Sequence, residues 1–80
     1  MSQTLNLVKN KLNELPNNIE AEQSVIGSIL LSNEIFDEIS LLISSKNFYE
    51  PMHQKIFGAI ESLIYKGLLA NPITLKNKKK

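Results

Sequence analysis

Apolar residues recur along the chain at the spacing of helices that bury one face, and the first helix is predicted from about Ile19 to Leu31. Its buried stripe has residues at i, i+1, i+4 and i+5, namely Val25, Ile26, Ile29 and Leu30. Asn18 or Asn17 can cap the first turn by accepting a hydrogen bond from an unpaired amide. Glu20 and Glu22 place negative charge where the helix dipole is positive. This segment is therefore a helix with a defined start.

Two further helices follow the same pattern. One is predicted from about Glu34 to Ile43, with apolar residues at i, i+1, i+4, i+7 and i+8: Ile35, Phe36, Ile39, Leu42 and Ile43. The next begins at Pro51, because the first helical position does not need an amide hydrogen. Its apolar stripe comprises Met52, Ile56, Phe57, Ile60, Leu63 and Ile64. Gly67 suits a left-handed C-cap after this stripe. The fold class is all-α, a small bundle of about three helices.

Glycines inside two of these helices need an explanation. A glycine within a helix costs up to about 1 kcal/mol relative to alanine. We therefore expect another helix to approach closely at Gly27 and at Gly58. On this hypothesis Gly27→Leu overpacks the crossing and destabilises the fold by about 1–3 kcal/mol.

The predicted domain lies between two polar ends. Residues 1–14 carry few apolar side chains and are predicted to form a flexible N-terminal arm, with a weak amphipathic turn or two as the alternative. The helical domain spans residues 15–75, and residues 76–80 form a Lys-rich tail. Thr74 is positioned to cap a fourth helix, but the chain runs out in lysines.

Composition narrows the class of protein. Apolar residues make up 42% of the 80 positions and charged residues 21%, which is typical of a folded soluble domain. A net charge of +1 provides no global basic field for nucleic acid. The chain has no cysteine, which excludes disulfides and thiolate metal sites. It also lacks a long apolar run and the order of a signal peptide, so we expect a cytoplasmic protein without a membrane segment.

No motif for catalysis is present. The three glycines are isolated and none precedes a Lys-Ser or Lys-Thr pair, so there is no phosphate-binding loop. A zinc site needs three or four ligands, and the single histidine, His53, is therefore interpreted as a hydrogen-bonded structural residue. The carboxylate pairs Glu20/Glu22 and Asp37/Glu38 are interpreted as solvated complements of helix dipoles. We predict no catalytic, cofactor-binding or metal-binding residue.

Aromatic and basic residues also have structural interpretations. The aromatic side chains fall at positions expected in the core or at helix junctions, which favours packing over base stacking: Phe36, Phe48, Tyr49, Phe57 and Tyr65. Lys76 and Lys78–Lys80 would give weak, salt-sensitive contacts to phosphates.

Three blocks resemble one known family. Leu15–Gly27 (LPNNIEAEQSVIG), Phe48–Phe57 (FYEPMHQKIF) and Gly67–Leu75 (GLLANPITL) are similar to the N-terminal domain of the bacterial DnaB-type replicative DNA helicase. The Ser-Asn-Glu turn at Ser32–Glu34 also lies where that family places its first turn between helices. The first block is the most specific, and the resemblance covers residues 15–75. Asn71 departs from the aspartate that the family usually shows.

This resemblance implies a role in assembly. The family's N-terminal domain resembles a collar above a hexameric motor that uses ATP and magnesium to unwind DNA. In that family the N-terminal domain docks primase and, in some members, a helicase loader. DNA is bound by the motor domain. By this resemblance the chain is the head of the collar without its helical hairpin and without the motor, so it is not an enzyme by itself. Its expected partners are other helicase subunits and primase.

Two other functions remain open at the sequence level. One is a freestanding helical adaptor that binds another protein. The other is a weak nucleic-acid binder that uses the lysines of residues 76–80. The lysine run also favours the hypothesis that the frame departs from the family sequence near Lys76, which would make the chain a truncated fragment, while a solvated tail fits the same residues. Few helices would then cover the core, so we expect an exposed apolar patch and self-association.

Overall fold

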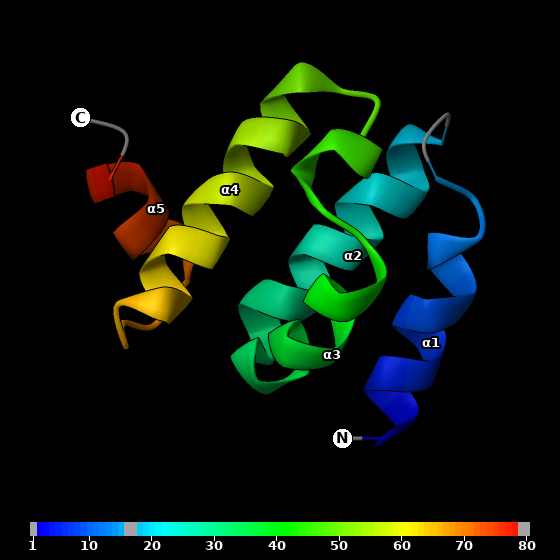
Figure 1. The fold of residues 1–80 in the computed structure, drawn as a ribbon, viewed down its shortest axis with the longest axis horizontal. Helices are drawn as coiled ribbons and strands as arrows, with labels where there is room; N and C mark the ends of the chain where they lie inside the picture. The colour runs from blue at the N-terminus through cyan, green and yellow to red at the C-terminus, as the bar shows by residue number, and fades with distance from the viewer. Residues whose placement is uncertain (1, 16–17, 79–80) are drawn as a thin grey trace.

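Five α-helices and two 3₁₀ turns make up the computed structural model in the part it describes, residues 2–15 and 18–78 (Figure 1). The helices are α1 (Ser2–Leu12), α2 (Ile19–Leu31), α3 (Phe36–Leu42), α4 (Pro51–Tyr65) and α5 (Pro72–Lys78). The 3₁₀ turns are η1 (Asn33–Ile35), which leads into α3, and η2 (Ser45–Asn47), which precedes α4. No strand occurs in the described ranges. The all-α prediction is confirmed, with five helices in place of about three.

Local signals fix the start and end of the two long helices. The Asn18 side-chain oxygen accepts from the amide of Ala21 at 3.0 Å, so Asn18, one of the two predicted residues, caps α2. The alternative, Asn17, lies outside the described residues. Pro51 occupies the first turn of α4. Gly67 ends that helix with φ 78°, where its amide donates to Ile64 and the amide of Leu68 donates to Leu63. These two bonds form a Schellman motif, which favours glycine at the left-handed position.

The N-terminal segment differs from its prediction. Residues predicted as a flexible arm form α1, which lies beside α2 (Figure 1). Val8 is only 2% exposed within the core, and Leu12 packs against it one turn later. A helix of this length is marginal alone in water, so burial against α2 supplies the stability that propensity does not. The prediction of an unstructured arm is therefore wrong for Ser2–Leu12.

The C-terminal segment also differs. Helix α5 continues through Lys76 into the segment predicted as a tail. The cap is Asn71, whose side-chain oxygen accepts from the amides of Ile73 and Thr74 at 2.9 and 3.0 Å. Thr74 bonds back, because its hydroxyl accepts from the amide of Asn71 and donates to the carbonyl of Leu69. The helix therefore starts at Pro72, two residues before the predicted cap.

The core lies between the long helices and the segment 33–48. Three phenylalanines pack against one another in it with tilted rings, the centroids being 5.4 Å apart for Phe36 and Phe57 and 5.1 Å apart for Phe48 and Phe57. All three are at most 1% exposed. Tyr49 and Tyr65, by contrast, lie on the surface. The predicted core packing holds for the phenylalanines, while the tyrosines occupy helix junctions.

The structure contradicts the predicted close approach at the glycines. A Cβ atom placed on Gly27 or Gly58 would meet no atom within 4 Å. Neither glycine therefore marks a tight helix crossing, and the overpacking expected for Gly27→Leu loses its basis. The sequence could not predict this, because a glycine within a helix looks the same in the sequence whether or not another helix contacts it.

A helix glycine with open space should be replaceable with a gain in stability. Gly27→Ala is expected to raise the free energy of unfolding by about 0.4–1 kcal/mol, since alanine restricts the unfolded chain and fits without strain. Gly67→Ala serves as the matched control, and its positive φ should make it destabilising by about 1 kcal/mol. Urea unfolding followed by circular dichroism measures both. A loss of stability in Gly27→Ala would contradict the open environment.

Candidate functional site

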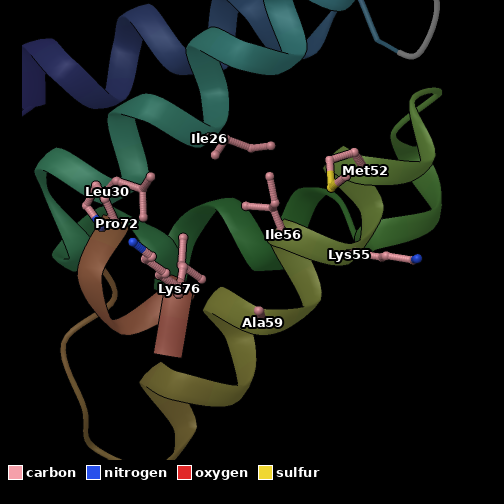
Figure 2. Close-up of a pocket in the computed structure, with 9 residues that line it drawn as sticks. Ile26, Leu30, Met52, Lys55, Ile56, Ala59, Pro72 and Lys76 are labelled. Carbon is pink, nitrogen blue, oxygen red and sulfur yellow. The ribbon is translucent and has the colours of Figure 1, made fainter. Parts of the chain in front are cut away.

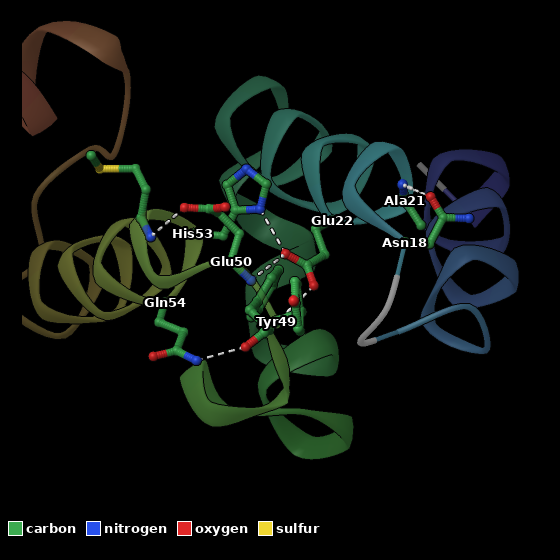
Figure 3. Close-up of polar contacts among 9 residues, drawn as sticks. Asn18, Ala21, Glu22, Tyr49, Glu50, His53 and Gln54 are labelled. Atoms are coloured by element: carbon green, nitrogen blue, oxygen red, sulfur yellow. Dashed lines mark hydrogen bonds and ion pairs between the residues drawn. The ribbon is translucent and has the colours of Figure 1, made fainter.

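A buried carboxylate connects α2 to the start of α4. Glu22, in the first turn of α2, is fully buried. Figure 3 shows its carboxylate between Tyr49, Glu50 and His53. One of its oxygens accepts from the amide of Tyr49 at 2.6 Å, and the other accepts from the amide of Glu50 at 3.3 Å and lies 2.7 Å from His53 Nδ1. These partners lie 27 to 31 residues away along the chain. Glu22 thereby fixes the junction that leads into α4.

The electrostatics of Glu22 favour its charged form. Burial raises the pKa of the Glu22 carboxyl. Hydrogen bonds from His53, Tyr49 and Glu50 and the charge interaction with His53 lower the pKa, and together they outweigh the effect of burial. The net pKa lies below its ordinary value of 4.5. The prediction that Glu22 is a solvated dipole complement is thus wrong, whereas Glu20, Asp37 and Glu38 are exposed as expected.

His53 has the structural role predicted for it. Because an ionised carboxylate only accepts hydrogen bonds, Nδ1 of His53 carries the hydrogen toward Glu22. The His53 ring also lies edge-on to Phe48, with centroids 6.4 Å apart. Glu22 and His53 therefore join the first and second sequence blocks.

A second polar contact holds α5 in place. The Asn33 side-chain amide donates to the carbonyls of Ile29 and Ala70 at 2.7 and 3.0 Å, and its oxygen accepts from the amide of Ala70 at 2.7 Å. Asn33 and Ala70 are 37 residues apart, and Ala70 is fully buried. The sequence indicated only a turn at this position. A side-chain pairing with a distant backbone leaves no local signal.

An apolar groove lies between the helices that these contacts position. It has a volume of about 510 Å³ and lies between α2, α4 and α5 (Figure 2). Its lining consists of Ile26, Leu30, Met52, Lys55, Ile56, Ala59, Pro72, Leu75 and Lys76. The side chains of Ile26 and Ile56 face each other across it in Figure 2. This volume is within the range of small-molecule pockets, roughly 300–1,000 Å³.

Large apolar side chains are also exposed elsewhere. Leu31 is 91% exposed and Leu41 85%. The other members of this exposed group include Leu42, Tyr65, Leu68, Leu69 and Ile73. These side chains lie on several separate elements, and the expected apolar patch and self-association stay predictions.

Comparison with known proteins identifies the family. The model of the DnaB-like helicase N terminal domain matches residues 14–80. The chain belongs to this family. The replicative DNA helicase DnaB of Rickettsia felis is 49% identical over 63 residues, which cover 79% of this chain and 13% of the helicase. The corresponding helicase of Rickettsia prowazekii is 42% identical over 89% of this chain and 16% of its own length.

The same relationship extends to another bacterial genus. The replicative DNA helicase DnaB of Buchnera aphidicola (subspecies Baizongia pistaciae) is 48% identical over 65 residues, 81% of this chain and 14% of the helicase. The chain thus spans about one seventh of the length of these relatives, and it corresponds to their N-terminal, non-catalytic domain. No solved structure matches the chain significantly. In the described ranges, no helix is both long and apolar enough to cross a membrane.

The residues present do not fit ATP or magnesium, the groups expected from the resemblance for a motor domain of the full-length family. Gly27 lies within α2, Gly58 within α4 and Gly67 in the turn after α4, so the three glycines form no phosphate-binding loop. Among the described residues, no cluster of three or more His, Asp or Glu side chains could hold a metal ion. Glu22 and His53 are instead engaged with each other and with backbone amides. The absence of any catalytic residue stays a prediction.

The Glu22 contacts predict an acid-sensitive stability. The pKa of Glu22 is lowered on folding, so its contribution is present above pH 4.5 and is lost as pH falls through the folded-state pKa. Glu22→Gln should destabilise the fold by about 1–3 kcal/mol at neutral pH, because it weakens buried hydrogen bonds. The difference from wild type should shrink below pH 4.5. Glu20→Gln is the control, and chemical unfolding from pH 3 to 7 measures the stability of both variants. Equal pH dependence of the two variants would contradict the stabilising role of Glu22.

The Asn33 contact predicts a second local weakness. Asn33→Ala leaves the buried amide and carbonyl of Ala70 without their partners and is expected to cost about 1–3 kcal/mol. Amide hydrogen exchange should rise most in α5 and the loop before it, because they depend on this contact. Asn13→Ala, at an exposed position, should change neither quantity. Unchanged exchange at Ala70 in Asn33→Ala would contradict the assignment.

Proposed function

We propose that this chain is the assembly and docking segment of a replicative DNA helicase. The observation that carries the proposal is the family match over residues 14–80, supported by 42–49% identity to bacterial replicative DNA helicases. The chain's own surface supports it as well, since exposed leucines and an apolar groove suit contacts with proteins. The segment contributes surface and geometry, while catalysis belongs to another domain.

The proposed parent activity is ATP-dependent unwinding of duplex DNA at the replication fork. ATP and magnesium would act at the motor domain of the full-length helicase, and the cytoplasm is the corresponding site of action. The segment would contact other helicase subunits in a hexameric collar and would dock primase. A rigid head suits docking, because the Glu22 and Asn33 contacts hold its helices in one arrangement before a partner arrives.

Direct binding tests this function. The purified chain, mixed with the primase of the same bacterium, is expected to sediment faster than either protein alone in analytical ultracentrifugation. Gly27→Ala should bind equally well, because it changes no contact within 4 Å. If chain and primase sediment independently at roughly 100 μM each, about a hundredfold above a dissociation constant of about 1 μM, primase docking is overturned. Binding of single-stranded DNA that disappears with salt would favour the nucleic-acid alternative.

A further inference from the structure

We infer that the groove between α2, α4 and α5 receives helix α3 of a second copy of this chain. The inference deepens the proposed function and rests on it, because assembly requires a defined contact between copies. Both halves of the contact lie on this chain: an apolar groove with basic residues at its edge, and a short acidic helix with exposed leucines.

The groove runs along about two turns of α4. Along α4 its wall is formed by Met52, Ile56 and Ala59, which stand at i, i+4 and i+7 and extend over about 10 Å at 1.5 Å per residue. Ile26 and Leu30 of α2 form the opposite wall. A trough of two helical turns between aliphatic walls suits the helix-in-groove mode of recognition.

Charge identifies the kind of helix that fits. The only charged residues lining the groove in the described part of the chain are Lys55 and Lys76, both exposed. Lys55 extends outward from α4, and Lys76 reaches toward the α2 side (Figure 2). A docked helix therefore needs carboxylates beside its apolar residues, since like charges in an interface are unfavourable.

Helix α3 has these features. Asp37 and Glu38 are exposed in its first turn. Leu41 lies four residues after Asp37, and Leu42 lies four residues after Glu38. Residues four apart share one face of a helix, so each carboxylate stands one turn before a leucine. Leu41 is 85% exposed and Leu42 is 56% exposed. Both would lose contact with water in an aliphatic groove.

The contacts that α3 makes within its own chain permit this docking. Glu38 pairs with Lys9 at 3.6 Å, but both side chains are about half exposed. Exposed ion pairs contribute roughly 0–1 kcal/mol, so Glu38 can exchange partners at little cost. Because the groove and α3 are different surfaces, the contact is heterologous, and each copy offers both halves to its neighbours.

Charge reversal with mixing tests the contact. Small interfaces are weak, so sedimentation velocity is measured at roughly 50–500 μM. Wild type should self-associate, and Lys55→Glu/Lys76→Glu and Asp37→Lys/Glu38→Lys should each associate roughly tenfold more weakly. An equimolar mixture of the two variants should recover association, since each reversed surface then finds its complement. Lys11→Glu/Lys66→Glu, with the same charge change as the groove variant, should associate like wild type.

A neutral pair of variants keeps the test independent of charge and folding. Leu41→Ser removes an exposed leucine of α3, and Leu31→Ser removes an equally exposed leucine at the end of α2. Circular dichroism should show both folded. Leu41→Ser should weaken self-association at least fivefold, while Leu31→Ser should leave it within twofold of wild type.

The outcomes separate this inference from the proposed function. A monomeric wild type over the whole concentration range, or association that no α3 or groove variant weakens, would overturn the inference. Failure of the mixture to recover association while the single variants remain folded would do the same. Primase binding is measured separately, so its loss would count against the proposed function and leave the self-contact standing.

Discussion

The Glu22 carboxylate is the contact on which the arrangement of the helices depends. Moving a charged group out of water is costly, and the cost is offset only when hydrogen bonds satisfy it. Tyr49, Glu50 and His53 supply those bonds from a segment more than 25 residues away, at the start of α4. An apolar side chain in place of Glu22 would fill space without specifying this junction. The carboxylate thus selects one packing among several that would bury similar apolar area.

Asn33 performs a comparable task at the other end of α2. Its amide group accepts from and donates to Ala70, and it also bonds the last turn of α2. Together Glu22 and Asn33 hold both ends of α2 against segments that come later in the chain. The apolar groove results from this arrangement, because α4 and α5 are positioned beside α2 without filling the space between the three helices.

Features set by neighbouring residues could be predicted from the sequence, whereas features set by contacts between distant segments could not. The bounds of α2 and the start and end of α4 depend on local chemistry, and Asn18, Pro51 and Gly67 act as predicted. Helix α1 is not predictable from its own segment, because its stability comes from the burial of Val8 against α2. The open space beside Gly27 is not predictable either, because helix propensity carries no information about a neighbouring element. The candidate groove was not predictable, since its residues come from three separate helices.

By itself, the amino-acid sequence determined the helical class, the main helix boundaries and the family, because periodicity, caps and short motifs are local properties. The tertiary structure decided which polar residues are buried. Glu20 and Glu22 are the same residue type and both lie in the first turn of α2. Glu20 is nevertheless exposed, whereas Glu22 is buried. It also decided that α5 packs beside α4 and that α3 presents its leucines outward. The physical reason is that burial depends on contacts between distant segments, and these exist only in the folded chain.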